Sequence, residues 1–289
     1  MPERQIIFVL GMGRSGTSAI TRVLSLCGAR LPEPLLGASE SNPMGHWEPI
    51  DAININNAFL SRRGASWYDP TLRLQSEIAF PHQEKETFIE EIRAYIERCN
   101  VGPLLVIKEP RIVALPEFWF EASRRASIIA KVVIPIRHPD QVAASLAARD
   151  GVSTELSNVL WLKYNFLAER SSRGLPRVFV EYPNLLSDWR KEIARISKCL
   201  TVDLSDADEV AIKHFLDPNL HRQKSCAMPK GTLGQAWTLD TYMALSATAR
   251  DEPLDLQKID AAFSDFAACE RTFRRALDEF RHRDLDPFL

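Results

Sequence analysis

Glycine and hydroxyl residues follow directly after a short apolar run near the N-terminus. The run is Ile6–Leu10, the segment after it is Gly11–Ser18, and apolar residues then recur at helical spacing until Gly28. This pattern predicts a buried strand, a glycine loop and a helix that begins at Thr17. The free N–H groups and the dipole of a helix N-terminus favour an anion. We therefore expect an anion, such as a phosphate, to bind at the loop, with these candidate contacts: Gly13, Arg14, Ser15, Gly16, Thr17 and Ser18.

The loop differs from the nucleotide-binding P-loop in one position. Gly11 and Gly16 have the spacing of G-x-x-x-x-G-K-[ST], but Thr17 stands where that motif has lysine. Without the lysine, the contact that a kinase or ATPase makes with the β- and γ-phosphates is lost. Arg14 supplies the only positive charge of the loop. A strand-to-helix turn without a ligand remains the alternative for the loop taken alone.

Composition and charge restrict the classes of protein. The chain has 289 residues and a net charge of −2, which does not suggest nucleic acid as a partner. Its five cysteines are scattered without a C-x-x-C pair, so we expect neither a metal site nor disulfides. No signal peptide or membrane-spanning segment is evident. These features predict a cytoplasmic protein with reduced thiols.

Strands and helices alternate along most of the chain. The predicted strands are Gln5–Leu10, Pro103–Ile107, Lys131–Ile136 and Arg177–Glu181, and the clearest helical patterns lie at Asp51–Ser61, Glu84–Arg98 and Thr154–Arg173. This order predicts an α/β fold in which a parallel sheet is flanked by helices on both faces. Such sheets bind ligands at the carboxyl ends of their strands. Three of the four segments at those ends carry Lys or Arg.

The last part of the chain is expected to be mostly helical. We predict one domain over residues 1–289, with a core at about 5–200 and a helical extension at about 201–289. Asp255–Arg281 has a stripe of apolar residues at helical spacing, which is typical of a helix face that packs into the core. The stripe comprises Leu256, Ile259, Phe263, Phe266, Phe273, Leu277 and Phe280.

A second motif follows the third predicted strand. Arg137 stands at the end of that strand and Ser145 lies eight residues later. Together with the glycine loop, this pair resembles the sulfotransferases that use 3′-phosphoadenosine 5′-phosphosulfate (PAPS). Residues 42–48, with the sequence Asn-Pro-Met-Gly-His-Trp-Glu, and residues 108–111, Lys-Glu-Pro-Arg, are similar to segments of bacterial sulfotransferase-family proteins. Residues 180–186 are similar to the strand–Tyr–helix segment of that family, so the resemblance spans roughly residues 5–190.

The resemblance implies a P-loop-like sulfotransferase fold and transfer of a sulfuryl group from PAPS, without a metal. The loop would hold the 5′-phosphosulfate, while Arg137 and Ser145 would hold the 3′-phosphate. An arginine side chain offers a planar fork of donors that suits a phosphate. The acceptor would be a hydroxyl or amine of a small molecule or glycan. The sequence leaves the oligomeric state open, a homodimer included.

A transferase of this kind needs a base near the acceptor hydroxyl. Glu40, His46, Glu48 and Asp51 are available in one Pro/Gly-rich segment, and Glu48 is the first choice. Glu48 lies beside Trp47, whose ring is expected to raise the carboxylate pKa by desolvation, and it occupies the family's Trp-Glu position. His46 is the second choice, because some sulfotransferases use a histidine base.

Further candidates lie at the other strand ends and late in the chain. Lys108 and Arg111 are candidates for contacts with phosphosulfate or with an acidic acceptor, or else for ion pairs with Glu109 or Glu117. Tyr182 is a candidate for stacking on adenine, with core packing as its alternative. The segment 229–237 faintly resembles a family segment that meets the 3′-phosphate, which adds two candidate contacts, Lys230 and Gly231.

Two other functions stay open at this point. The first is a nucleotide kinase or NTPase, against which Thr17 counts. The second is a nucleotide-binding protein without catalysis, against which the intact Arg14, Arg137 and Ser145 count.

Overall fold

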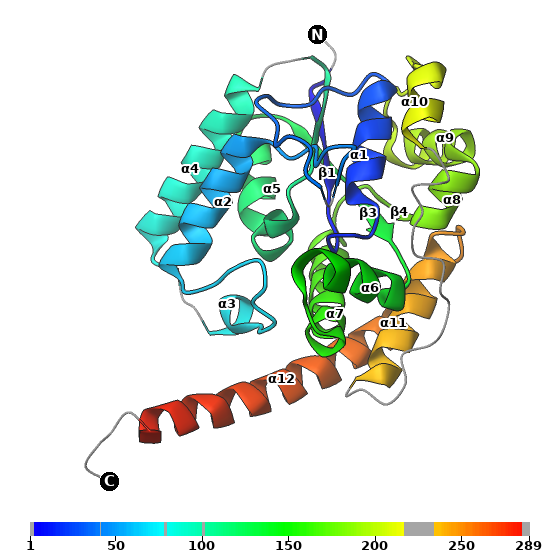
Figure 1. The fold of residues 1–289 in the computed structure, drawn as a ribbon. Coiled ribbons are helices and arrows are strands. Elements are labelled where there is room, and N and C mark those ends of the chain that lie inside the picture. Colours follow the sequence, from blue (N-terminus) through cyan, green and yellow to red (C-terminus); the bar gives the residue numbers. More distant parts are fainter. Residues whose placement is uncertain (1–2, 41, 78–79, 100–101, 217–233, 285–289) are drawn as a thin grey trace.

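A four-stranded parallel sheet lies at the centre of the computed structural model, which describes residues 3–40, 42–77, 80–99, 102–216 and 234–284. The strand order is β2-β1-β3-β4 (Figure 1). The strands are β1 (Gln5–Val9), β2 (Leu104–Ile107), β3 (Ile129–Ile136) and β4 (Arg177–Glu181). The predicted parallel sheet is confirmed, although β3 begins two residues earlier than expected.

Alternate residues of β1 point to opposite faces of the sheet, as strand geometry requires. Ile6 and Phe8 join one apolar cluster, and Ile7 and Val9 join a second. The first cluster includes side chains of α2 (Ile50–Arg62), α4 (His82–Arg98), α5 (Pro116–Arg125) and α7 (Thr154–Ser171). The second includes side chains of α1 (Thr17–Leu26), α9 (Trp189–Leu200) and α10 (Glu209–Phe215). Helices therefore cover both faces, as the sequence predicted.

A helix begins within eight residues of the carboxyl end of each strand. These helices are α1, the 3-10 helix η1 (Pro110–Ala114), α6 (Pro139–Asp150) and α8 (Tyr182–Ser187). Proline near the start of η1, α6 and α8 suits the helix N-terminus, where its missing N–H is not needed. Because the strands are parallel, all four helix N-termini meet at one edge of the sheet.

The end of the described chain is helical, as expected, but its apolar stripe is only half buried. The two long elements there are α11 (Gln235–Thr248) and α12 (Leu256–Asp284). In the first half of α12, Ile259 and Phe266 are buried in the core, while in the second half Phe273, Leu277 and Phe280 are more than half exposed. Figure 1 shows α12 running past the body of the protein. Among the described residues, its outer half meets the short helix α3 (Arg73–Ser76) and the residue after it, through the ion pairs Arg73–Asp278 and Arg274–Glu77, and these contacts leave its apolar side chains largely exposed. The expectation that the whole stripe is core is therefore wrong.

No helix in the described part of the chain is long and apolar enough to cross a membrane.

The two halves of α12 should respond differently to the loss of a phenyl ring. Phe266→Ala is expected to lower the free energy of unfolding by about 3–5 kcal/mol, because Phe266 packs in the core against Phe166 and Trp237. Phe280→Ala, which removes a ring that is 59% exposed, is expected to change it by no more than about 0.5 kcal/mol. Urea denaturation measures both values. Equal losses would show that the outer half of α12 is also packed.

Candidate active site

The glycine loop between β1 and α1 is held under two aromatic rings. Gly16 has φ +90°, a left-handed conformation, and Arg14 has φ +69°. A Cβ on Gly13 would lie 2.7 Å from Trp67 Cη2, and one on Gly16 would overlap the ring of Tyr182. Packing therefore requires glycine at both positions, and the left-handed backbone conformation adds a second reason at Gly16. The neighbours that approach this closely are aromatic side chains of the protein itself.

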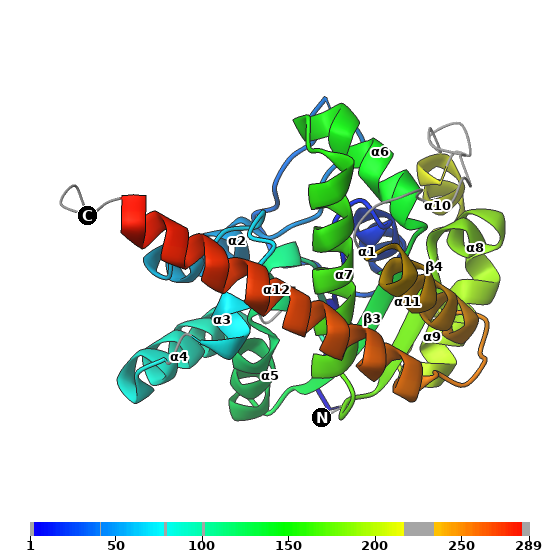
Figure 2. The same ribbon diagram turned by 90° about the horizontal axis from the view of Figure 1, so that it is seen from below.

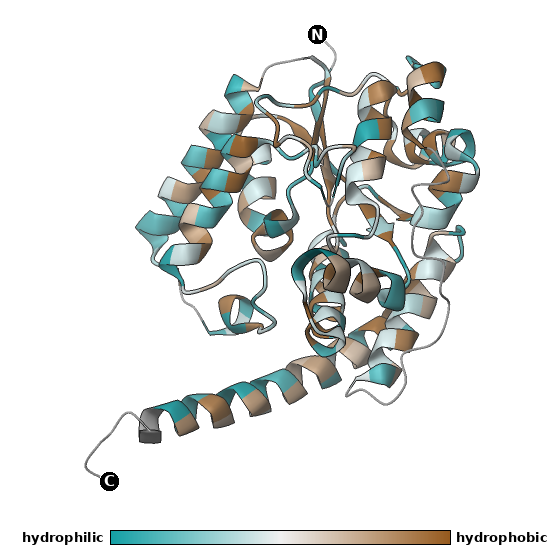
Figure 3. Ribbon diagram, in the orientation of Figure 1, coloured by the Kyte–Doolittle hydropathy of each residue, from teal (hydrophilic) through white to brown (hydrophobic). Residues whose placement is uncertain are grey.

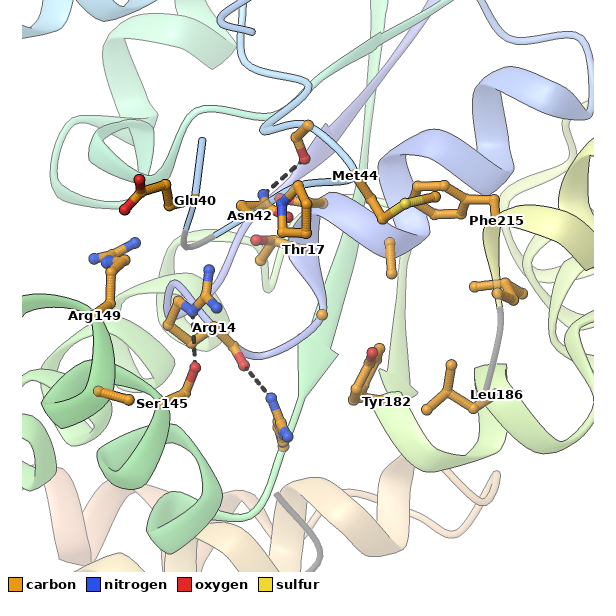
Figure 4. Close-up of a pocket in the computed structure, with 18 residues that line it drawn as sticks. Arg14, Thr17, Glu40, Asn42, Met44, Ser145, Arg149, Tyr182, Leu186 and Phe215 are labelled. Carbon is orange, nitrogen blue, oxygen red and sulfur yellow. Dashed lines mark hydrogen bonds between the residues drawn. The ribbon is translucent and has the colours of Figure 1, made fainter. Parts of the chain in front are cut away.

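The two sequence motifs meet through direct hydrogen bonds. Arg14 Nε donates to Ser145 Oγ at 2.9 Å, and Arg137 Nη1 donates to the carbonyl oxygen of Arg14 at 3.1 Å (Figure 4). The ends of β1 and β3 are neighbours in the sheet, which brings residues more than 120 positions apart into contact. We call Arg14, Arg137 and Ser145 the arginine–serine cluster.

Surrounding side chains fix the guanidinium of Arg137. Its Nε donates to Gln141 Oε1 at 3.0 Å, and the ring of Tyr182 lies 5.1 Å from its central carbon. The indole of Trp161 is fully buried and donates to the Arg137 carbonyl at 3.1 Å. Burial lowers the pKa of Arg137 below its ordinary value, because the guanidinium has lost much of its hydration. An anion that binds here would restore favourable interactions to this charge.

A cavity of 450 Å³, the first cavity, opens beside this cluster. Arg14, Ser145 and Arg149 lie at one end of it, and an apolar group lies at the other (Figure 4). The apolar group consists of Met44, Leu186 and Phe215, with Tyr182 on the same side. A site with a cationic end and an apolar end suits a nucleotide, which carries charged phosphates on a flat, largely apolar base.

A second cavity, of 270 Å³, is also lined by residues of the glycine loop. It shares Arg14, Thr17, Ser18 and Arg149 with the first cavity. Its other lining residues include His46, Glu48, Trp67, Tyr68, Lys108 and Arg111. The glycine loop therefore contributes residues to both cavities.

Lys108 is the centre of the polar contacts in the second cavity. It follows β2, is 3% exposed, and its Nζ forms an ion pair with Glu48 Oε1. The same nitrogen donates to the His46 carbonyl at 3.1 Å and to Ser18 Oγ at 3.2 Å. The sequence left ion pairs of Lys108 with Glu109 or Glu117 open, but its partner in the structure is Glu48. An ammonium group from β2 thus reaches the start of α1, close to where a nucleotide P-loop would place its own lysine.

Both candidate bases line the second cavity. Glu48 is 8% exposed and bound to Lys108. Trp47 does not line that cavity; its ring packs against Phe215, and the guanidinium of Arg22 stacks on it. The environment of Glu48 is therefore set by Lys108 rather than by the indole we expected. Burial lowers the pKa of His46, which favours its neutral form, and His46 Nε2 lies 2.9 Å from Ser39 Oγ.

A buried polar network stands behind Arg111. Arg111 forms an ion pair with Glu109, one of the two partners considered from the sequence. Glu109 is fully buried and also accepts a hydrogen bond from Asn56 Nδ2 at 2.6 Å, while Asn56 Oδ1 accepts one from Trp119 Nε1 at 3.0 Å. Burial raises the pKa of Glu109. The network holds Arg111 at the wall of the second cavity.

The predicted contact residues of the glycine loop differ in which cavity they line, if any. Ser15 is fully buried, its N–H donates to the Met12 carbonyl at 3.2 Å, and it lines neither cavity. Thr17 and Ser18 line both cavities, while Gly13 lines the second cavity and Gly16 the first. Lys230 and Gly231 lie outside the described residues.

Arg149 is a site residue that the sequence analysis missed. It lies four residues after Ser145 and eight after Gln141, on the same face of α6, and it lines both cavities. That spacing is the signal by which the sequence could have indicated Arg149. Asp150 accepts a hydrogen bond from Arg149 Nε at 2.6 Å and another from Tyr68 OH at 2.7 Å. Trp67 and Tyr68 had no comparable signal, because the loop that carries them has no periodicity.

The packing of Tyr182 on Gly16 can be tested with a pair of glycine substitutions. Gly151 also has a left-handed φ, +65°, but a Cβ there would touch nothing within 4 Å. Gly151→Ala is expected to cost only the conformational penalty, about 1–2 kcal/mol of unfolding free energy. Gly16→Ala should cost about 1–3 kcal/mol more, because the methyl group would overlap Tyr182. Equal costs in denaturant titrations would rule out the close contact.

Comparisons with known proteins place this fold. No protein-family model and no curated protein matches the chain. Among solved structures, the chain is similar to the sulfotransferase domain of the Synechococcus PCC 7002 olefin synthase, with a TM-score of 0.52 and 20% identity over 85% of this chain and 96% of that domain. The sulfotransferase domain from the curacin biosynthetic pathway also matches, with a TM-score of 0.43 and 14% identity over 92% and 99%. The likeness to the olefin synthase domain shows that the chain has the fold of a sulfotransferase domain.

Proposed function

We propose that the protein transfers a sulfuryl group from PAPS to a hydroxyl or amine of a small molecule or glycan, and releases adenosine 3′,5′-bisphosphate. The observation that carries this proposal is that the glycine loop lines both cavities. Arg14, Thr17 and Ser18 line both of them. A group held by the loop in the first cavity would thus face whatever binds in the second.

The lining of the first cavity supports a nucleotide with a 3′-phosphate as the ligand. Arg137 and Ser145 would hold the 3′-phosphate, and the N-terminus of α1 with Thr17 and Ser18 would hold the 5′-phosphate. Charge-assisted hydrogen bonds of this type are typically worth about 1.5–3 kcal/mol each. Tyr182, Leu186 and Phe215 offer an apolar surface to the base.

The second cavity contains the side chains that would act on the acceptor. As the acceptor oxygen attacks sulfur and the bond from sulfur to the 5′-phosphate oxygen breaks, negative charge grows on that phosphate. Lys108, which contacts Ser18, and the N–H groups of the loop are placed to stabilise this charge. Glu48 would accept the proton of the acceptor hydroxyl. The ion pair with Lys108 keeps the carboxylate beside the loop.

A nucleotide kinase is the alternative that shares this loop. Lys108 supplies a cation near the loop, but Arg137 and Ser145 lie beside Arg14 in the first cavity, where a nucleoside triphosphate has no 3′-phosphate to offer them. The site thus favours a bisphosphate nucleotide over ATP.

Ligand-induced stabilisation tests the nucleotide. Adenosine 3′,5′-bisphosphate without magnesium should raise the melting temperature, since a ligand at 100 times its Kd stabilises the folded state by about 2.7 kcal/mol. ATP with magnesium should have little effect. Arg137→Ala should remove most of the shift, whereas Arg190→Ala, a surface control that pairs with Glu209 on α10, should keep it. A shift with ATP and magnesium but none with the bisphosphate would disprove the proposal.

Glu48→Gln tests the base, because the amide keeps the size of the side chain but cannot accept a proton. Transfer from labelled PAPS, measured with an acceptor found by metabolite screening, should fall about 10²–10⁴-fold. The thermal shift with the bisphosphate should persist, since Glu48 lines only the second cavity. Full activity in this variant, with a large loss in His46→Asn, would assign the role of base to His46 instead.

A further inference from the structure

A third cavity, which we call the apolar cleft, lies between α7, the outer part of α12 and the segment that leads into α3 (Arg73–Ser76). Its volume is 730 Å³, larger than either cavity of the candidate active site. Figure 2 shows α12 passing across α7 and beside α3, and Figure 3 shows apolar residues continuing along the outer half of α12. The main apolar lining residues are Leu74, Leu162, Trp237, Phe266, Phe273 and Leu277.

The cleft is separated from the active site by one short stretch of chain. Trp67 and Tyr68 line the second cavity, while Asp69, Pro70 and Thr71 line the apolar cleft. Two residues of α7 hold this stretch in place: Tyr164 OH donates to the Trp67 carbonyl at 3.0 Å, and Lys163 Nζ donates to the Asp69 carbonyl at 2.8 Å. The cleft is thus a compartment of its own.

One buried polar side chain in the wall of the cleft has no partner. Asn158 on α7 is 4% exposed, and neither its amide nitrogen nor its amide oxygen has a hydrogen-bond partner in the described part of the protein. A buried amide without partners costs about 1–3 kcal/mol. Native proteins leave few such groups, and binding pockets combine apolar walls with a small number of polar groups of this kind.

The charged residues around the cleft do not favour a charged ligand over a neutral one. Four arginines and four carboxylates line it, and three of the arginines are in ion pairs. These pairs are Arg63–Glu84, Arg73–Asp278 and Arg274–Glu77. The fourth, Arg281, lies near Asp278 and contributes to lowering the pKa of that carboxyl group. An acid that entered the apolar part would lose hydration, while the arginines around it already interact with carboxylates.

We propose that the apolar cleft binds a neutral, elongated apolar molecule with one amide, carbonyl or hydroxyl group that hydrogen-bonds to Asn158. The apolar walls would cover the chain of the molecule, and Asn158 would fix its polar group. The inference is independent of the sulfotransferase proposal, because it uses no residue of the two active-site cavities.

Binding can be measured with the neutral fluorescent probe N-phenyl-1-naphthylamine. Its fluorescence should rise with the protein, and decanamide should displace it at concentrations at least about tenfold lower than decanoate does at pH 8. Phe273→Glu, at an exposed position in the cleft, should weaken probe binding, while Val210→Glu, which changes an 80% exposed residue on α10, should not. Absence of probe binding, or equal effects of the two substitutions, would refute the site.

Asn158→Leu separates a ligand contact from a mere packing defect. The variant should still bind the probe and melt no lower than the native protein, because leucine removes an unpartnered amide. Its affinity for decanamide should fall about tenfold. Unchanged affinity for decanamide would overturn the role of Asn158.

Sedimentation tests whether a second copy of the chain covers the cleft. A dimer that Phe273→Glu dissociates would mean that a second copy, and not a small molecule, occupies the cleft.

Discussion

The candidate active site depends on the link between the ends of β1 and β3. Arg137 binds the carbonyl oxygen of Arg14, and the side chain of Arg14 binds Ser145. This link sets the conformation of the glycine loop, in which Arg14 adopts a left-handed φ that non-glycine residues rarely adopt. It also places three polar groups in one cavity before any ligand arrives. Preorganised donors of this kind lose little freedom on binding, which makes them effective for anions.

A second link, from β2, completes the arrangement. Lys108 reaches Ser18 at the start of α1 and Glu48 in the segment before α2. The glycine loop thus receives one cation from each neighbouring strand of β1: Arg137 from β3 and Lys108 from β2. Arg137 lines the first cavity and Lys108 lines the second. Under the proposed function, the loop would bind the nucleotide in the first cavity and face the acceptor in the second. Thr17 stands where a nucleotide P-loop has lysine. In this protein the ammonium group near the loop belongs to Lys108, which lies outside the loop.

Much of this could be predicted from the sequence, because strong local patterns determine it. Buried strands are short apolar runs, and the parallel topology brings Arg14, Lys108, Arg137 and Tyr182 to one edge of the sheet. The pairing of Lys108 with Glu48 could not be predicted, since the segment that carries Glu48 has no periodicity. The exposure of Phe273, Leu277 and Phe280 could not be predicted either. Apolar residues at helical spacing show which face of a helix is apolar. They do not show how much of the length of the helix is covered by other parts of the protein.

The most direct measurement of the central claim compares adenosine 3′,5′-bisphosphate with adenosine 5′-monophosphate by calorimetry. If the arginine–serine cluster binds a 3′-phosphate, the native protein should bind the bisphosphate at least about 100-fold more tightly than the monophosphate. This is the difference expected for two charge-assisted contacts. Ser145→Ala should reduce that preference about tenfold, because it removes one contact with the 3′-phosphate. Equal affinities for the two nucleotides in the native protein would contradict the account.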